Sequence, residues 1–506
     1  MKKQLFFYAL LVPLLIYGQT YESFRTDIYD PVGADQELFG FAIKVSDDGS
    51  RILVASRAYD GPSLPLNTNT GKVAMYEYNG TDWMKIGGDI IGEQPGDEFG
   101  RTIAMNATGS IIAVGAQSGD PNGVTQAGYV KVYQYDGANW VQLGATFEGQ
   151  TAGRALGSSI SLSADGMRVA ISAIGANTGR GEVKVYDYNG SAWTQVGSTL
   201  SGAVNNDQFG FSIDLDNAGT FLAVGAPFVD ANGTPSGQNR GQVKVFEYTT
   251  DWTNIFTAAG VVGMNDNFGR AVALSGNKSV LAVGATQGGA DSGYVRTYGY
   301  SSSSNTYVYF RDVSGENVND RFGESISLNE NGIFMAVGAP QNDAFGSNNG
   351  KVYLYKRELQ GGVNHWYSRQ GEYDDTATSG DGDTVALTSD GNVLFTNTLA
   401  ENNPNGIPGL IKSYADFSTL SVEASVMDVN VKIYPNPTTG IVYISNVSKN
   451  PIHTIAVFDL MGRACFEENV NSIENVSIDL SNLSAGSYLI KIQSGQSSKT
   501  IKVNKR

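Results

Sequence analysis

The sequence predicts an all-β fold, a seven-bladed β-propeller followed by a small C-terminal β-sandwich, and three observations lead to this prediction. First, a Phe-Gly pair or a variant of it recurs at intervals of 53 to 60 residues. Second, the chain has 62 glycines and 10% aromatic but only 17% charged residues, a composition typical of many short strands joined by tight turns. Third, all five tryptophans occupy one place in the repeat.

The recurring pair marks seven copies of one unit. The pair begins at Phe39, Phe99, Leu156, Phe209, Phe268, Phe322 and, in a degenerate seventh copy, Asp381. In the copy at Phe209, Ser212–Leu215 alternates with a period of two, which is typical of a half-buried strand. Phe221–Ala226 is almost continuously apolar, as a strand covered on both faces would be. Val243–Phe246 alternates again, and a strand with tryptophan follows.

The tryptophans indicate that each copy has a fourth strand. Four of them precede the next repeated pair by 16 residues: Trp83, Trp140, Trp193 and Trp252. Trp366 precedes Asp381 by 15 residues. Seven copies of four strands predict a propeller, in which each blade buries its faces against its neighbours. We therefore expect the repeated aromatic residues to pack between blades.

The seventh copy lacks a fourth strand of its own. It has strands near Thr384–Leu387, Val393–Thr396 and Leu410–Tyr414, after which the composition changes. Tyr21–Ile28 matches the spacing of Trp83–Ile90, with Tyr21 in the place of the tryptophan. We expect this N-terminal segment to complete the last blade, because an open ring would expose strand edges.

Both ends of the chain differ from the repeat region. Residues 1–18 resemble a signal peptide, with Lys2 and Lys3 before an apolar run and Gly18 at the cleavage position. The propeller is assigned to residues 19–419, a polar linker to 420–430 and the C-terminal domain to 431–506. The mature chain has no apolar stretch of membrane-spanning length.

The charge distribution excludes one class of partner. The whole chain has a formal net charge of −16, whereas residues 4–427 carry 24 basic and 44 acidic residues, a net charge of −20. A nucleic acid would require a basic surface. We therefore expect no nucleic-acid partner.

The repeats, with Phe-Gly followed by strands such as Leu222–Pro227 and by Gly241–Tyr248, resemble the FG-GAP repeats of integrin α-subunit propellers and their bacterial relatives. Many members of that group bind Ca²⁺ in the first hairpin of a blade. The corresponding turns here, Ser46–Gly49, Ser163–Gly166 and Asn329–Gly332, are too short to supply six or more oxygen ligands. We expect no cofactor, and no residue is assigned as a metal ligand.

The last part of the chain resembles a different family. Val431–Gly440, Val457–Gly462 and Leu483–Ile490 follow one another before the basic end Lys502–Arg506. These three blocks are similar to the type A C-terminal sorting domain of the type IX secretion system of certain Gram-negative bacteria. The resemblance implies that the secretion machinery is a partner, and that the protein is extracellular or held at the outer-membrane surface.

The residues that could carry chemistry are few. The chain has two histidines, His365 and His453, in different domains, and a single cysteine, Cys465, which we expect to be a small buried side chain. Aspartates precede four of the repeated pairs: Asp97, Asp207, Asp266 and Asp320. We expect them to cap turns. The alternative is a ring of carboxylates that holds a cation near the axis.

The variable loops between the second and third strands are the better candidates for function, because a rigid scaffold presents them on one face. The candidate binding residues are Asp120, Asn122, Asp230, Asn232, Asn342 and Asp343. The sequence predicts a binding or adhesion protein for a glycan or a protein, not an enzyme. The alternatives are a glycan-active hydrolase or lyase with paired carboxylates, and a passive surface-layer component.

Overall fold

The computed structural model describes most of the propeller and of the C-terminal domain. The described residues are 22–23, 25–29, 37–61, 68–230, 239–260, 265–287, 292–343, 350–360, 363–373, 382–398, 409–415, 431–446, 452–459, 464–472, 476–494 and 497–506. The signal peptide and its predicted cleavage after Gly18 lie outside these residues and stay predictions. No helix in the described part of the chain is both long and apolar enough to cross a membrane.

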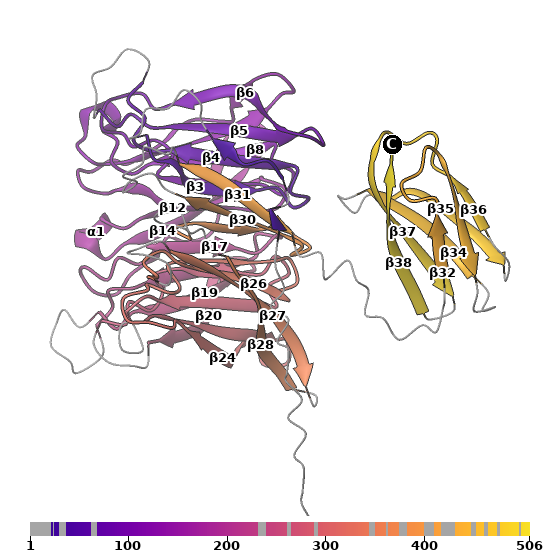
Figure 1. Ribbon diagram of the computed structural model, residues 1–506. Helices are drawn as coiled ribbons and strands as arrows, with labels where there is room; N and C mark the ends of the chain where they lie inside the picture. The colour runs from indigo at the N-terminus through magenta and orange to yellow at the C-terminus, as the bar shows by residue number, and fades with distance from the viewer. Residues whose placement is uncertain are drawn as a thin grey trace, which may run out of the picture. The chain divides into compact units, whose positions relative to one another are not determined.

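The described residues up to Ala415 belong to one compact unit, coloured indigo to orange in Figure 1. They form seven antiparallel sheets. Blade 1 consists of β3 (Phe39–Val45), β4 (Arg51–Ser56), β5 (Lys72–Tyr78) and β6 (Trp83–Ile91). Blade 2 consists of β7 (Thr102–Met105), β8 (Ile111–Ala116), β9 (Tyr129–Tyr135) and the split outer strand β10 (Trp140–Gln142) and β11 (Phe147–Glu148). Blade 3 consists of β12 (Leu156–Leu162), β13 (Arg168–Ala173), β14 (Glu182–Tyr188), β15 (Trp193–Gln195) and β16 (Leu200–Ser201). The second-to-third connections of blades 2 and 3 contain η1 (Pro121–Gly123) and α1 (Ala176–Gly179).

The remaining blades repeat the same strand order. Blade 4 consists of β17 (Ser212–Leu215), β18 (Phe221–Ala226), β19 (Gln242–Tyr248) and β20 (Trp252–Ala259). Blade 5 consists of β21 (Val272–Leu274), β22 (Val280–Ala285), β23 (Tyr294–Ser301) and β24 (Thr306–Ser314). Blade 6 consists of β25 (Ser325–Leu328), β26 (Phe334–Ala339), β27 (Lys351–Gln360) and β28 (Val363–Tyr373). Blade 7 consists of β29 (Val385–Leu387), β30 (Val393–Thr398), β31 (Leu410–Ala415) and the N-terminal strands β1 (Glu22–Ser23) and β2 (Ile28–Tyr29).

The glycine of the repeated pair has the same backbone conformation in all seven copies. Its φ lies between +86° and +93° at Gly40, Gly100, Gly157, Gly210, Gly269, Gly323 and Gly382. Only glycine adopts this conformation without strain. Gly382, in the degenerate seventh copy, has a φ of +89°. Seven blades are therefore confirmed, including the one with the weakest sequence signal.

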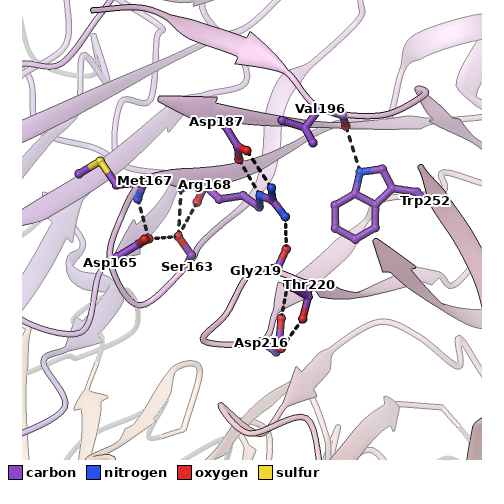
Figure 2. A network of polar contacts seen from close by, with 10 residues as sticks. All are labelled: Ser163, Asp165, Met167, Arg168, Asp187, Val196, Asp216, Gly219, Thr220 and Trp252. Carbon is purple, nitrogen blue, oxygen red and sulfur yellow. Dashed lines mark hydrogen bonds and ion pairs between the residues drawn. The ribbon is translucent and has the colours of Figure 1, made fainter. Parts of the chain in front are cut away.

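The core lies between neighbouring blades. The second strand of blade 4, Phe221–Ala226, is buried at every residue, as its apolar run predicts. Aromatic side chains of the repeated pair are also buried, with Phe268 and Phe322 completely inaccessible. Trp252 opens the fourth strand of blade 4, and its indole N–H donates to the carbonyl of Val196 in the preceding blade at 3.1 Å (Figure 2). The prediction that these aromatic residues pack between blades is confirmed.

The N-terminal segment closes the ring, as predicted. Glu22 pairs with Ala415 and Ile28 with Ile411, both antiparallel to β31. Tyr21 and Phe24, on which the sequence argument depended, lie outside the described residues. Arg25, between the two short strands, is buried.

Arg25 connects the N-terminal segment to blade 1. Its Nη1 donates to the carbonyl of Gly49, in the first turn of that blade. Its guanidinium carbon lies 4.3 Å from the ring centroid of Tyr78. Ring closure therefore uses a buried cation as well as strand pairing.

The first turns of the blades form a closed ring of backbone hydrogen bonds around the axis. The amide of Asp47 in blade 1 donates to Ala107 of blade 2 at 2.8 Å, and Ser389 of blade 7 donates back to Asp47 at 3.0 Å. The remaining donor–acceptor pairs are Ala107 to Ala164, Ala164 to Asn217, Asn217 to Gly276, Asn277 to Glu330 and Glu330 to Ser389. We call this the turn ring, and it links every blade to both of its neighbours.

The C-terminal unit, residues 416–506, is a small β-sandwich, as predicted. One sheet contains β32 (Val431–Tyr434), β33 (Ile441–Asn446) and β36 (Val476–Asp479). The other contains β35 (Ala464–Ser472), β34 (Ile452–Asp459), β37 (Gly486–Ser494) and β38 (Ser497–Lys505). The expectation that Cys465 is buried is wrong, because it lies near the start of β35 with its side chain exposed. The core is instead made of aliphatic side chains such as Val442, Val457 and Ile490.

Candidate functional site

The connections between second and third strands meet the connections between blades on one face of the propeller. The amide of Phe99 donates to the carbonyl of Thr70 at 3.0 Å, and the amide of Phe209 donates to Arg180 at 2.9 Å. Both acceptors belong to second-to-third connections, and both donors to inter-blade connections. We call this face, opposite the turn ring, the loop face.

The four aspartates before the repeated pairs hold these loops in shape. Asp97 Oδ2 accepts hydrogen bonds from the amide of Gln94 at 2.9 Å and from the Tyr129 hydroxyl at 2.7 Å. Asp320 Oδ2 accepts from the amide of Asn317 at 3.0 Å. Burial raises the pKa of Asp97, and the hydrogen bonds it accepts oppose that rise. These contacts agree with the prediction that the aspartates cap turns.

Immediately after each aspartate, one residue lies in the left-handed region of the backbone map. These residues have φ between +50° and +54°, and with the corresponding residues of blades 1 and 3 they are Leu38, Glu98, Ala155, Gln208, Asn267 and Arg321. Non-glycine residues adopt this conformation at a cost. We call these the rim residues. The same backbone presents apolar, acidic, amide and basic side chains in different blades.

A second set of variable residues directly follows the repeated glycine. It contains Phe41, Arg101, Ser158, Phe211, Arg270, Glu324 and Asp383. Each stands at or next to the beginning of a first strand, and the first strands contact one another in a complete circle around the axis. These residues therefore surround the mouth of the central channel on the loop face.

Two groups of arginine and glutamate lie at this mouth. In the first, Glu98 accepts from Arg57 Nη1 at 3.2 Å and from Arg101 Nη1 at 2.9 Å. Arg57 also lies over the ring of Phe41, with its guanidinium carbon 4.3 Å from the centroid.

In the second group, Glu324 pairs with Arg270 at 2.9 Å and with Arg321 at 2.8 Å. Arg270 lies over Phe211 at 5.1 Å, just as Arg57 lies over Phe41. The first group joins blades 1 and 2, and the second joins blades 5 and 6. They therefore stand on opposite sides of the seven-bladed ring.

The structure places the predicted loop residues on separate blades. Asp120 accepts the amide of Gln126 at 2.6 Å, and Asn122, with a φ of +54°, donates to Glu148 at 2.7 Å. Both shape the β8–β9 connection.

The predicted pair in blade 6 divides into a buried and an exposed residue. Asn342 is completely buried and donates to Asp320 at 2.7 Å. Asp343 is exposed. Asn232 lies outside the described residues. The five described candidates therefore do not form one constellation.

Asp230 contributes to a pocket on blade 4. The pocket has a volume of about 560 Å³ and is lined on the loop face by Asp207, Asp230 and Val204. Lys244 and Asn254, on the third and fourth strands, complete its polar side. Burial raises the pKa of Asp207, the amide of Val204 lowers it, and the negative charge of Asp230 raises it further.

The channel itself contains a second polar cavity next to the turn ring, with a volume of about 160 Å³. Its lining includes Asp214, whose Oδ2 accepts the amide of Leu274 at 2.8 Å and whose Oδ1 accepts the Ser161 hydroxyl at 3.2 Å. Burial raises the pKa of Asp214, whereas the positive charge of Lys44 lowers it.

The first-hairpin turns use their acidic side chains internally. Asp165 Oδ1 accepts the Ser163 hydroxyl at 2.5 Å and the amide of Met167 at 2.9 Å (Figure 2). Asp48 makes the equivalent contacts in blade 1. Among the described residues, no group of three or more His, Cys, Asp or Glu side chains is arranged to hold a metal ion.

The class of protein follows from these features: a seven-bladed propeller with a variable loop face, joined to a small β-sandwich. Comparison with known families confirms both resemblances. An FG-GAP repeat matches residues 314–355, at the blade 5–blade 6 junction and the first three strands of blade 6. A secretion system C-terminal sorting domain matches residues 432–506. The chain is thus an FG-GAP-like propeller that carries a type IX sorting domain, which implies secretion or display at the cell surface.

Comparison with individual proteins gives weaker similarities than the comparison with families. No curated protein matches the sequence. Among solved structures, hydrazine synthase from Kuenenia stuttgartiensis has 11% sequence identity and a TM-score of 0.48. The match covers 77% of this chain and 99% of that chain.

The rim residues and the residues after the repeated glycine were missed by the sequence reasoning, which concentrated on the longer loops. A signal for them exists. When the repeats are aligned, the residue directly before the repeated pair differs in all seven copies, whereas aspartate precedes it in four copies and phenylalanine follows it in five.

Proposed function

We propose that this chain is an exported binding protein, released or displayed at the cell surface, that recognises a glycan or a protein through the loop face of its propeller. The observation that supports the proposal is the variation at the rim. Glu98, Gln208 and Arg321 differ in charge and size, yet they have φ of +50°, +50° and +53°. A constant backbone with variable side chains is how a rigid scaffold adapts to a ligand.

A binding screen with matched variants tests this proposal. The mature protein, residues 19–506, is applied to a glycan array and used in pull-downs from cell-surface extracts. Gln208→Trp enlarges a rim residue, and Val308→Trp makes the same kind of change on the outer strand β24, where Val308 is 51% exposed. We expect the rim variant to lose the ligand and the outer variant to keep it. If the wild-type protein binds nothing on the array and nothing in the pull-downs, the result would favour a passive surface-layer component.

The blade 4 pocket supports a second candidate, a glycan-active enzyme. Asp207 and Asp230 both line it, and burial, together with the negative charge of Asp230, raises the pKa of Asp207. Glycosidic bond hydrolysis uses one protonated and one ionised carboxyl group. Release of reducing ends from a polysaccharide panel tests this candidate. Asp230→Asn should abolish the release, whereas Asp120→Asn, in blade 2, should not.

A further inference from the structure

We propose that the channel mouth binds the acidic groups of an anionic polysaccharide, through the arginines of the two Arg–Glu–Arg groups. This inference rests on the proposed function, because it names a ligand class for the loop face. The first group consists of Arg57, Glu98 and Arg101, and the second of Arg270, Glu324 and Arg321.

The first argument is charge. Each group has two guanidiniums and one carboxylate, so each carries a net charge of about +1, because arginine remains ionised at neutral pH. The region that contains them has a net charge of −20. The two positive groups are therefore exceptions in an acidic protein. Both lie at the mouth of the channel.

The second argument is the number of hydrogen-bond donors. A guanidinium has five N–H donors. Arg101 and Arg321 contact their glutamates through one nitrogen each and keep side-chain exposures of 33% and 35%. Planar guanidiniums bind carboxylate and sulfate-like groups in a bidentate manner. These two arginines can therefore receive an acidic group without losing their glutamates.

The third argument is that polar atoms at the same mouth lack partners. Arg57 Nε and Asn267 Oδ1 are buried and have no hydrogen-bond partner within the described part of the chain. Buried polar groups of this kind normally bond to protein, water or ligand. Asn267 is the rim residue that lies three positions before Arg270.

The identity of the polymer follows from what surrounds the arginines. Gln208 and Ser158 supply an amide and a hydroxyl group at the same mouth, which suit the hydroxyl groups of sugars. Asn267 is buried, and its amide nitrogen donates to Gln287 at 2.9 Å. The two positive groups stand on opposite sides of the ring. A chain with repeated acidic groups can contact both, whereas a single small anion cannot.

Binding of defined polymers tests the inference with the mature protein. Polygalacturonate supplies carboxylates, dextran sulfate supplies sulfates, dextran is neutral, and poly-L-glutamate is an acidic polypeptide. We expect one or both acidic polysaccharides to bind, and binding to weaken strongly between low and moderate salt because exposed charges are screened. Dextran should not bind, and poly-L-glutamate should bind at least about tenfold more weakly, a difference of about 1.4 kcal/mol.

Three double variants decide the role of the arginines. Arg101→Gln with Arg321→Gln should weaken binding at least about tenfold. Glu98→Gln with Glu324→Gln removes the competing carboxylates and should tighten binding, a result that a merely structural role would not produce. The control, Lys85→Gln with Arg311→Gln, removes two positive charges from the outer strands β6 and β24 and should stay within about twofold.

Several outcomes would overturn the inference. They are an absence of binding to both acidic polysaccharides, equal or tighter binding to poly-L-glutamate, and equal weakening in the mouth and control variants. Circular dichroism and melting of each variant exclude unfolding as the cause. If the wild-type protein instead binds a neutral glycan or an extract protein, and Gln208→Trp abolishes that binding, the proposed function stands although this inference fails.

Discussion

Replacing Arg25 by alanine should weaken the closure of the propeller ring. Its counterpart inside the ring is Arg168, whose Nη1 donates to the carbonyl of Gly219 in the next blade at 2.8 Å (Figure 2). Arg168 also lies 4.8 Å from the ring centroid of Tyr248, as Arg25 lies beside Tyr78. Arg168 is the first residue of a second strand, β13.

In blade 7 the corresponding position is occupied by Val393, the first residue of β30, whose side chain is uncharged. Arg25 therefore supplies from the N-terminal segment the guanidinium that Arg168 supplies from within its own blade. Only 6% of Arg25 is exposed.

The expected loss can be worked from these contacts. A hydrogen bond to a charged group contributes about 1.5–3 kcal/mol, and a buried cation–π contact adds up to about 2 kcal/mol. Removal of the guanidinium also removes the cost of burying it, and burial lowers the pKa of Arg25 to about 10, which still leaves it charged at neutral pH. We take about 2 kcal/mol as the net loss, which corresponds to roughly thirtyfold more frequent local opening.

Hydrogen exchange followed by mass spectrometry measures this opening. Amides of Leu410–Ala415 and Ile28–Tyr29 should exchange roughly thirtyfold faster in Arg25→Ala, whereas blades 3 and 4 should not change. Arg25→Met, which keeps the apolar stem, should show a smaller effect. Arg311→Ala, on the exposed face of β24, is the matched control. Unchanged exchange at β31, or an increase spread evenly over all blades, would refute the role of Arg25 in closure.

Four further predictions follow from the structure. Deletion of residues 19–30 exposes the edge of β31, so it should lower the melting temperature and promote aggregation in light scattering, whereas deletion of residues 19–20 alone should do neither. Melting curves in calcium and in chelator should agree within about 2 °C, and a large loss of stability in chelator would show that calcium ligands exist in other loops. Asp214→Asn should raise the melting temperature at pH 7.5 but not at pH 4. Burial raises the pKa of Asp214, so the stability that the protonated carboxyl contributes is lost as pH rises through that pKa. A lower melting temperature of the variant at pH 7.5 would contradict this. Removal of residues 431–506 should keep the protein inside the cell, and immunoblots that find it in the culture fluid would contradict the role of the sorting domain.

The blade architecture could be predicted from the sequence because the repeat is local. Gly382 adopts a positive φ, and the apolar run Phe221–Ala226 is covered on both faces. Both features can be inferred from a few neighbouring residues, without knowledge of distant parts of the chain. That the N-terminal segment completes blade 7 was also predictable, since a closed ring leaves only one place for an unpaired N-terminal strand, and Ile28 pairs there with Ile411.

The functional surface could not be predicted in the same way. Asn342 looked like an exposed loop residue, but it is buried because its amide satisfies Asp320, a partner 22 positions away in sequence. Glu98 and Arg101 were not singled out from the sequence, and Arg57, the third member of their group, is 41 residues from Glu98. Such contacts depend on the relative positions of loops from neighbouring blades. The repeat pattern alone does not determine these positions.

Ring closure also constrains the order in which this protein can complete its fold. Glu22 pairs with Ala415, so blade 7 cannot be finished until almost the whole propeller has been made. The turn ring has the same property, because Ser389 donates to Asp47 only when the last blade is in place. The sorting domain, residues 432–506, follows β31 in sequence. A chain truncated before β31 therefore lacks both the strand with which the N-terminal segment pairs and the C-terminal sorting domain.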